Sequence, residues 1–309
     1  MELTQQQIER YGQDGFLVVE KFFDGDELAQ LVQTTQELKA EAEAGNFPAG
    51  RRSELADVVQ LPDGARRLRR IASPDLYHPV YDRIMRHPRL VQAVGQLLGG
   101  SVRFDHAKLN FKPPLDKTQA VSSSTAGVLE WHQDWAFYPH TNDDMLAVGI
   151  MLTDNTAENA PLQVIPGSHR EELFDHHEDG YFVGGVRPDK LRGLGEQAVS
   201  CIAPAGSIEI HHVRTLHSSG SNYSDQERPL LLLNYVAVDA FPVFHSYDWN
   251  EFDSRILLGE STQRPRVTQV PIRVPLPVRQ KDEDAYGQYI SGSIYDSQAE
   301  ASWTDEKAA

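Results

Sequence analysis

The N-terminal third of the chain opens with a helix start signal followed by a short apolar strand. Thr4 and Gln7 fit a capping box, in which each side chain can satisfy a backbone N–H of the other residue, and this predicts a helix to about Gln13. Gly15 then interrupts the helical pattern. The four apolar residues 16–19 that follow predict a strand.

Two further helical stretches are predicted before residue 100. Residues 26–44 place leucine and valine at helical spacing with charged residues between them, and Gly45 ends the pattern. A helical pair is predicted over residues 79–98 and is broken at Pro88, because proline disfavours helix in the residue before it. We therefore expect residues 1–100 to be a mainly helical N-terminal support.

Beyond Gly100 the pattern changes to short alternating or β-rich runs separated by Pro, Gly and Asn. The predicted strands cover residues 101–111, 128–138, 146–152, 162–165, 207–213 and 230–238. Irregular connections between strands argue against a parallel α/β sheet, since that fold alternates strands with helices. The sequence therefore predicts a mainly β fold with flanking α-helices and a jelly-roll core over residues 101–275.

Composition narrows the class of protein. The 309 residues suffice for a substantial core, and we expect a single domain spanning residues 1–309, with a polar tail at residues 281–309. Lys and Arg total 29 against 45 Asp and Glu, a formal net charge of -16. Such a charge would repel a polyphosphate backbone, so nucleic acid is not an expected partner.

Cysteine usage and hydropathy indicate the compartment in which we expect the protein. Cys201 is the only cysteine, which excludes an intrachain disulfide and a multi-cysteine zinc site. The sequence opens on polar residues, and no stretch approaches the roughly 20 apolar residues that span a bilayer. We expect a cytoplasmic protein without a membrane partner, whose metal, if it has one, binds to histidine and carboxylate side chains. The sequence does not indicate an oligomeric state.

The sharpest chemical signal is His132-Gln133-Asp134 in a segment predicted to be a strand or a strand end. Residues two apart on a strand project from the same face, so His132 and Asp134 can converge on one ion while Gln133 points away. Two histidines and one carboxylate on one face of an octahedron leave positions open for a chelating cosubstrate and O2, as in non-haem Fe(II) oxygenases.

A third ligand and a cosubstrate anchor follow about 85 residues later in the same chain. His217 precedes a turn-rich segment, and Arg228 opens the apolar strand after it. If the chain folds back at residues 222–225, Arg228 approaches His217. A guanidinium is a permanent, bidentate partner for a carboxylate, which suits the far end of 2-oxoglutarate.

These motifs together resemble the phytanoyl-CoA dioxygenase family. The resemblance covers most of the chain: residues 3–19 are similar to the family's opening helix and strand, and residues 109–114 (Leu-Asn-Phe-Lys-Pro-Pro) precede the metal triplet as in the family. Residues 156–169 match its loop after the metal triplet, and residues 217–228 match its distal histidine and cosubstrate arginine. The resemblance implies a double-stranded β-helix, a cupin-like form of the predicted jelly roll.

The resemblance also implies roles for individual residues. His132, Asp134 and His217 would be the iron ligands and the catalytic centre. Arg228 would bind the far carboxylate of 2-oxoglutarate, with Ser219 beside it and Lys112 as a further cosubstrate contact. In some relatives an upstream basic residue also contacts the cosubstrate; the candidates here are Arg69 and Arg70, in a cluster that otherwise fits a solvated surface. Ile150 departs from the pattern, because acyl-CoA-oxidising members carry Trp there.

Other histidines have simpler interpretations. His211 and His212 lie on the strand before His217, and a supporting or packing role fits them better than ligation. The polar run at residues 175–179 contains a His-His pair but fits an exposed insertion better than a metal site.

The predicted function is an Fe(II)- and 2-oxoglutarate-dependent dioxygenase with O2 as the second cosubstrate, hydroxylating an unactivated C–H bond of a small organic metabolite with release of succinate and CO2. Two alternatives stay open at this point. One is a cupin-like metalloenzyme, an isomerase or direct oxygenase, that does not use 2-oxoglutarate. The other is a non-catalytic binding protein on the same scaffold.

Overall fold

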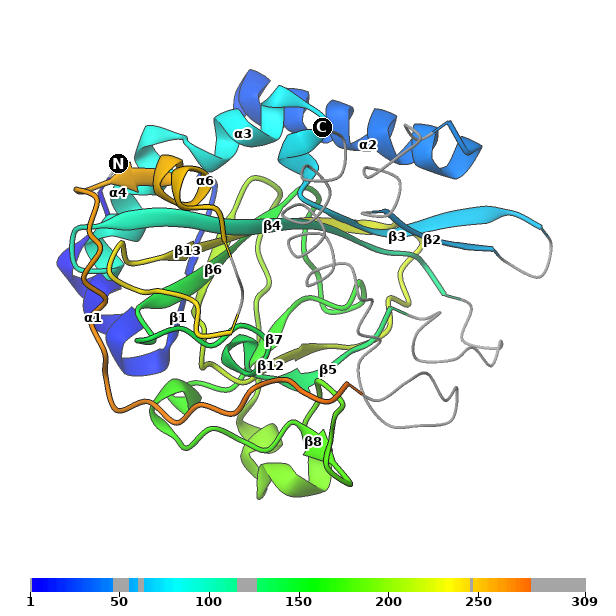
Figure 1. The fold of residues 1–309 in the computed structure, drawn as a ribbon. Coiled ribbons are helices and arrows are strands. Elements are labelled where there is room, and N and C mark those ends of the chain that lie inside the picture. Colours follow the sequence, from blue (N-terminus) through cyan, green and yellow to red (C-terminus); the bar gives the residue numbers. More distant parts are fainter. Residues whose placement is uncertain (1, 47–55, 61–63, 116–126, 245–246, 279–309) are drawn as a thin grey trace, which may run out of the picture.

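Two antiparallel sheets face each other and form the centre of the computed structural model, which describes residues 2–46, 56–60, 64–115, 127–244 and 247–278 (Figure 1). In order across the sheet, the larger one contains β1 (Phe16–Val19), β11 (Ile208–His212), β6 (Met145–Met151), β13 (Arg228–Val236), β4 (Val102–Lys112), β3 (Arg66–Ala72) and β2 (Ala56–Gln60), with β14 (Ile256–Leu258) also paired to β4. The smaller contains β10 (Val199–Ser200), β7 (Gln163–Val164), β12 (His217–Ser219) and β5 (Leu129–His132). A separate hairpin joins β8 (His177–Glu178) and β9 (Tyr181–Phe182). The predicted two-sheet β core is confirmed.

Helices from the N-terminal third cover the outer face of the larger sheet (Figure 1). They are α1 (Gln5–Asp14), α2 (Gly25–Ala44), α3 (Pro79–Met85) and α4 (Pro88–Leu97); α6 (Trp249–Ser254) lies near β14. The capping box of Thr4 and Gln7 is present, and Gly15 takes φ 77, a left-handed conformation that glycine adopts without strain. Pro88 starts α4 rather than interrupting a helix, since its missing N–H is not needed there.

Alternation along the central strands gives the larger sheet two different faces. Leu231 and Leu233 of β13 pack with the helices in the main hydrophobic cluster, as does Ile150 of β6. Their neighbours on the strand point into the space between the two sheets, called the interior below. Ile150 therefore lies on the helix side of the sheet.

The structure differs from the sequence predictions in two segments. The segment 128–138 is not one strand, because β5 ends at His132 and a 3-10 turn, η3 (Asp134–Ala136), follows. The N-terminal third also contributes the β2–β3 hairpin, so the arginine cluster lies on the edge of the larger sheet. The tail predicted at 281–309 lies outside the described residues, and the single-domain boundary stays a prediction.

Shorter 3-10 turns punctuate the connections at η2 (Pro74–Leu76), η4 (Ser168–Arg170), η5 (Pro188–Leu191) and η6 (Leu194–Gln197). None of the helices in the described ranges is both long and apolar enough to cross a bilayer.

Candidate metal centre

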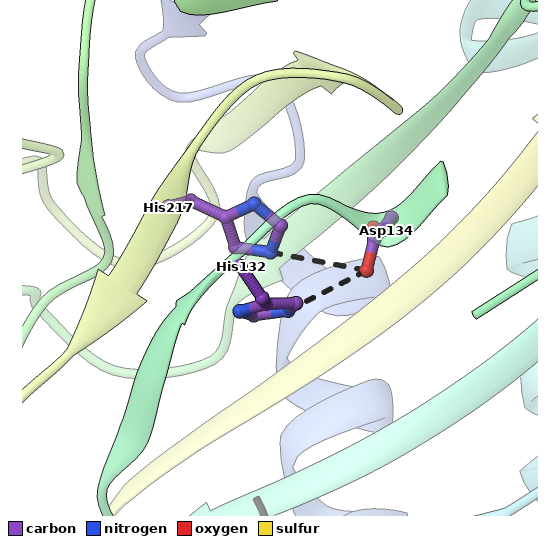
Figure 2. A group of neighbouring side chains, drawn as sticks. All are labelled: His132, Asp134 and His217. Atoms are coloured by element: carbon purple, nitrogen blue, oxygen red, sulfur yellow. Dashed lines mark ion pairs between the residues drawn. The ribbon is translucent and has the colours of Figure 1, made fainter. Parts of the chain in front are cut away.

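Two strands of the smaller sheet and the turn after one of them bring His132, Asp134 and His217, the triad, together (Figure 2). His132 ends β5, Asp134 opens η3, and His217 begins β12, directly opposite His132 in the sheet register. One ligand atom from each residue lies within 4.8 Å of the other two, and all three residues are buried. In the described part of the chain this is the only such group of three.

The hydrogen bonds of the two histidines leave the correct nitrogens for a metal. His132 Nδ1 lies 2.8 Å from the carbonyl of Glu130, and His217 Nδ1 lies 2.9 Å from that of Thr215. A carbonyl can only accept, so both Nδ1 atoms carry the proton and both Nε2 atoms keep a free lone pair. The Nε2 atoms face Asp134 Oδ1 at 3.6 Å and 3.9 Å (Figure 2).

Electrostatics favour the protonation states that bind a cation. Burial alone would raise the pKa of Asp134, but the surrounding imidazole groups of His132, His211 and His217 hold it well below its usual value. Burial lowers the pKa of His217, and the neighbouring histidines lower it further. The triad therefore presents an ionised carboxylate and neutral imidazole, a donor set that fits a divalent first-row metal.

Gln133, between two triad residues, is held by the loop that the sequence placed at the surface. Its backbone N–H donates to His176 Nε2 at 2.9 Å, and its side chain accepts from Phe174 N–H at 2.9 Å and donates to the Arg214 carbonyl at 2.8 Å. His176 is buried, and this burial lowers its pKa to about 3, so the ring stays neutral and can accept. The expectation of an exposed run was wrong for His176, which anchors the ligand segment without being a ligand.

His211 supports the triad from the opposite sheet. Its Nε2 lies 3.4 Å from Asp134 Oδ2, and its Nδ1 lies 2.9 Å from Oε2 of the fully buried Glu209. Burial alone would lower the pKa of His211, but the two carboxylates raise it to about 10, so the ring donates from both nitrogens. Gly149 on the adjacent strand leaves the room for Glu209: a Cβ there would lie 2.3 Å from Glu209 Oε1.

His212 points to the other side of the strand. Its Nδ1 accepts from Arg214 N–H at 3.1 Å, and its ring lies 5.4 Å from that of His169. The separation of the adjacent His211 and His212 follows from strand alternation.

Two buried basic side chains lie in the interior next to the end of β12, the strand that begins at His217. Arg228 and Lys112 are opposite each other on β13 and β4, and both are almost fully buried. Arg228 Nε donates to the Asn159 carbonyl at 3.1 Å, whereas its Nη1 is buried without a hydrogen-bond partner in the described ranges. Burial lowers the pKa of Arg228 to about 10, so it stays charged at neutral pH.

Lys112 and Ser219 contact each other. The Nζ of Lys112 donates to the carbonyls of Ser219 and Gly220 at 3.1 Å and 2.6 Å and to Ser219 Oγ at 2.5 Å. These hydrogen bonds connect the end of β12 to the larger sheet. The Ser219 hydroxyl accepts one of them, so its own hydrogen is available for donation. Burial and the charge of Arg228 lower the pKa of Lys112 well below its usual value. Among the described residues, no carboxylate forms an ion pair with Lys112 or Arg228, so the free Nη1 of Arg228 could donate to a bound carboxylate.

A third interior cation, Lys108, was not predicted from the sequence. It is partly buried on β4, and its Nζ lies 5.4 Å from the centre of the Tyr138 ring. Burial lowers its pKa to about 8, while the charge of Asp134 acts in the opposite direction and that of Arg70 in the same direction. Lys108 shares a strand face with Lys112, but alternation alone does not show that this face of β4 lies toward the triad.

Arg69 and Arg70, the upstream candidates for a cosubstrate contact, diverge. Arg69 Nη2 forms an ion pair with Asp57 on β2 at 2.7 Å. Arg70 lies opposite Asn110 of β4, and its charge acts on Lys108 two positions away on that strand.

Known proteins similar to this chain include several dioxygenases. The model of the family described as phytanoyl-CoA dioxygenase (PhyH) matches residues 11–230. A probable alpha-ketoglutarate-dependent hypophosphite dioxygenase of Stutzerimonas stutzeri is 32% identical over 282 residues, 88% of this chain and 92% of the relative. An ectoine dioxygenase of Bordetella parapertussis is 28% identical over 254 residues, 77% of this chain and 76% of the relative.

Among solved structures, EctD from S. alaskensis with bound Fe superposes with a TM-score of 0.61. It is 25% identical, and the match covers 76% of this chain and 77% of EctD. The antiparallel sheets and flanking helices thus match the double-stranded β-helix that the sequence resemblance implied.

Proposed function

The chain belongs to the phytanoyl-CoA dioxygenase family, and from that premise we propose which of its residues hold iron and cosubstrate and what kind of molecule it oxidises. It is an Fe(II)- and 2-oxoglutarate-dependent dioxygenase acting on a small molecule. The alternatives of a cupin-like enzyme without a keto acid and of a non-catalytic binding protein are therefore set aside.

His132, Asp134 and His217 bind Fe(II) in this proposal. The observation that carries it is the convergence of three buried ligand atoms within 4.8 Å, with both imidazole Nε2 lone pairs directed at Asp134 Oδ1. Backbone carbonyls fix both rings, so the ligands are oriented before the metal arrives.

Arg228 binds the far carboxylate of 2-oxoglutarate in this proposal. Its unpartnered Nη1 is a buried donor that needs an acceptor. The Ser219 hydroxyl supplies one further donor. When bound, iron and 2-oxoglutarate supply the oxidising chemistry with O2, and these side chains supply orientation and exclusion of water.

Anaerobic titration with Fe(II) and then 2-oxoglutarate tests these roles through the weak visible charge-transfer band of the chelate. The band should form in the wild type, be absent in His132→Ala, and need roughly tenfold or more 2-oxoglutarate in Arg228→Ala, since a hydrogen-bonded charge contributes about 1.5–3 kcal/mol. His212→Ala, which alters a histidine directed away from the triad, is the matched control. A normal band in His132→Ala would overturn the ligand assignment.

The reaction we propose is hydroxylation, and hypophosphite is the first substrate to test. The hypophosphite dioxygenase relative matches nearly the full length of both chains, more than the ectoine dioxygenase relative does. Insertion of oxygen into one P–H bond would convert hypophosphite to phosphite. Phosphite formed in equal amount with succinate, followed by phosphorus NMR, would support this substrate. Succinate formation that responds to ectoine and not to hypophosphite would reject it.

A further inference from the structure

One side of the interior carries a polar, cationic row that the iron and cosubstrate sites do not use. His106 and Lys108 are two positions apart on β4 and project into the interior with Lys112. Among the described residues, the Nζ of Lys108 lies over the Tyr138 ring at 5.4 Å and forms no hydrogen bond or ion pair. An ammonium group on the interior face of a strand without a hydrogen-bond acceptor favours an anion beside it.

Lys108 is too far along the strand to belong to the cosubstrate clamp. Four positions separate it from Lys112, and at about 3.3 Å per residue their Cα atoms are roughly 13 Å apart. Arg228 lies opposite Lys112, and Leu232 lies opposite Lys108. Lys108 and Arg228 therefore lie at separate positions along the interior.

His106 gives the Lys108 position a hydrogen-bonding partner. Its Nδ1 lies 2.6 Å from Asp105 Oδ2, which as a carboxylate can only accept, so Nδ1 carries a proton. Burial lowers the pKa of His106, so the ring is neutral and its Nε2, which has no hydrogen-bond partner in the described part of the chain, is an acceptor for a donor group of a ligand. The His106 ring packs edge-on against Tyr138 at 4.8 Å, on the side where Lys108 also lies.

The Lys108 position is close to the metal centre. The charge of Asp134 acts on both Lys108 and His106, and Tyr138, which both contact, follows η3 by two residues. A group held there would lie beside the Tyr138 ring, at the end of the turn that begins at Asp134. Its oxidisable bond must therefore lie on the same atom as the charge or on a neighbouring atom.

We propose that Lys108 binds the anionic group of the substrate, and that the substrate is a compact oxyanion whose oxidised X–H bond adjoins that group. The proposal rests on the iron and cosubstrate roles proposed above. The reaction balances as X–H, O2 and 2-oxoglutarate giving X–OH, succinate and CO2, with one oxygen atom entering X–OH and the other entering succinate.

Ligand binding to the anaerobic Fe(II)–2-oxoglutarate enzyme separates this proposal from the former one. Hypophosphite and acetate are the anionic probes, and acetamide is the neutral partner of acetate with nearly the same shape. With 2-oxoglutarate saturating, the two anions should shift the charge-transfer band and acetamide should not. A band that never forms overturns the iron and cosubstrate roles and this proposal with them. A normal band that acetate and acetamide shift equally, or not at all, overturns only this proposal.

Variants then assign the anion to Lys108. Lys108→Met and Lys108→Gln should each weaken hypophosphite and acetate binding roughly tenfold or more and keep the affinity for 2-oxoglutarate within about twofold. Their intact band shows that they fold. Lys39→Met, which removes a lysine bound to Glu43 on α2, should match the wild type. Anion affinity unchanged in both Lys108 variants, or a loss of 2-oxoglutarate affinity in its place, overturns the assignment.

Discussion

His211 Nε2 donates to Asp134 Oδ2 across 3.4 Å, and so engages the carboxylate oxygen that the two triad histidines do not share. Asp134 Oδ1 faces those histidines and is left for the metal. Because Oδ2 is occupied, His211 would favour an Asp134 carboxylate that offers a single oxygen to the proposed iron.

Removing this support should weaken metal binding. His211→Phe would leave Glu209 buried and unpaired, so the double variant Glu209→Val with His211→Phe is the cleaner test. We expect Fe(II) affinity to fall by about 10–100-fold, the usual effect of losing a partner of a metal ligand, in anaerobic competition with a chelator. His212→Phe is the control and should bind iron as the wild type does. Equal affinity in all three proteins would contradict a role for His211.

Two glycine substitutions should have opposite effects on stability. Gly149→Ala would place a Cβ 2.3 Å from Glu209 Oε1 and should lower the free energy of unfolding by about 1–3 kcal/mol, the range for overpacking a core. Gly12→Ala adds a methyl group to α1 where nothing lies within 4 Å, and should raise it by about 0.5–1 kcal/mol. Urea unfolding of the metal-free proteins measures both. A stable Gly149→Ala protein would mean that Glu209 can move away at little cost.

Charge alone should not replace the guanidinium of Arg228. Arg228→Lys keeps the positive charge and loses both the planar fork and the bond from Nε to the Asn159 carbonyl. We expect about tenfold or more loss of 2-oxoglutarate affinity, with iron affinity unchanged. The exposed Arg66→Lys is the matched control. If Arg228→Lys binds 2-oxoglutarate normally, the far carboxylate is held mainly by another group.

Anion binding should weaken in mildly alkaline solution. Burial lowers the pKa of Lys108 to about 8 against the opposing charges of Asp134 and Asp105, and Arg70 lowers it further. Lys108 is therefore charged below about pH 8 and becomes neutral as the pH rises through that value. Hypophosphite stays anionic throughout, so its apparent Kd should increase between about pH 7 and 9 in the wild type. The same step in Lys108→Met would show that a different group titrates.

Local signals predicted most of the helices and the metal triad. The capping box at Thr4 and the alternation from His132 to Asp134 each act over a few residues, so the sequence shows them directly. The pairing of His217 with His132 could be predicted because each histidine belongs to a motif that resembles one of the family's. The strand predicted through residue 138 failed because Asp134 begins a 3-10 turn, which still directs its carboxylate toward the histidines.

Features that depend on distant partners could not be predicted from the sequence. Lys108 and His106 read as ordinary polar positions of a strand until β4 is known to face the triad. His176 lies in a charged run typical of a surface loop. It is nevertheless buried, and it accepts a hydrogen bond from Gln133, which is 43 residues away in the sequence. The β2–β3 hairpin was missed because its arginine-rich strand lacks the apolar alternation of a buried strand.

Because Gly149 has no side chain, the residues at positions 149, 209 and 211 depend on one another. An enzyme of this family that gains a side chain there has no room for a glutamate opposite, and without that glutamate the histidine beside Asp134 loses its second carboxylate. Glycine, glutamate and histidine at these positions should therefore be gained or lost together among descendants of a common ancestor. A designer who transplants His211 into another member of the family would have to transplant the other two with it.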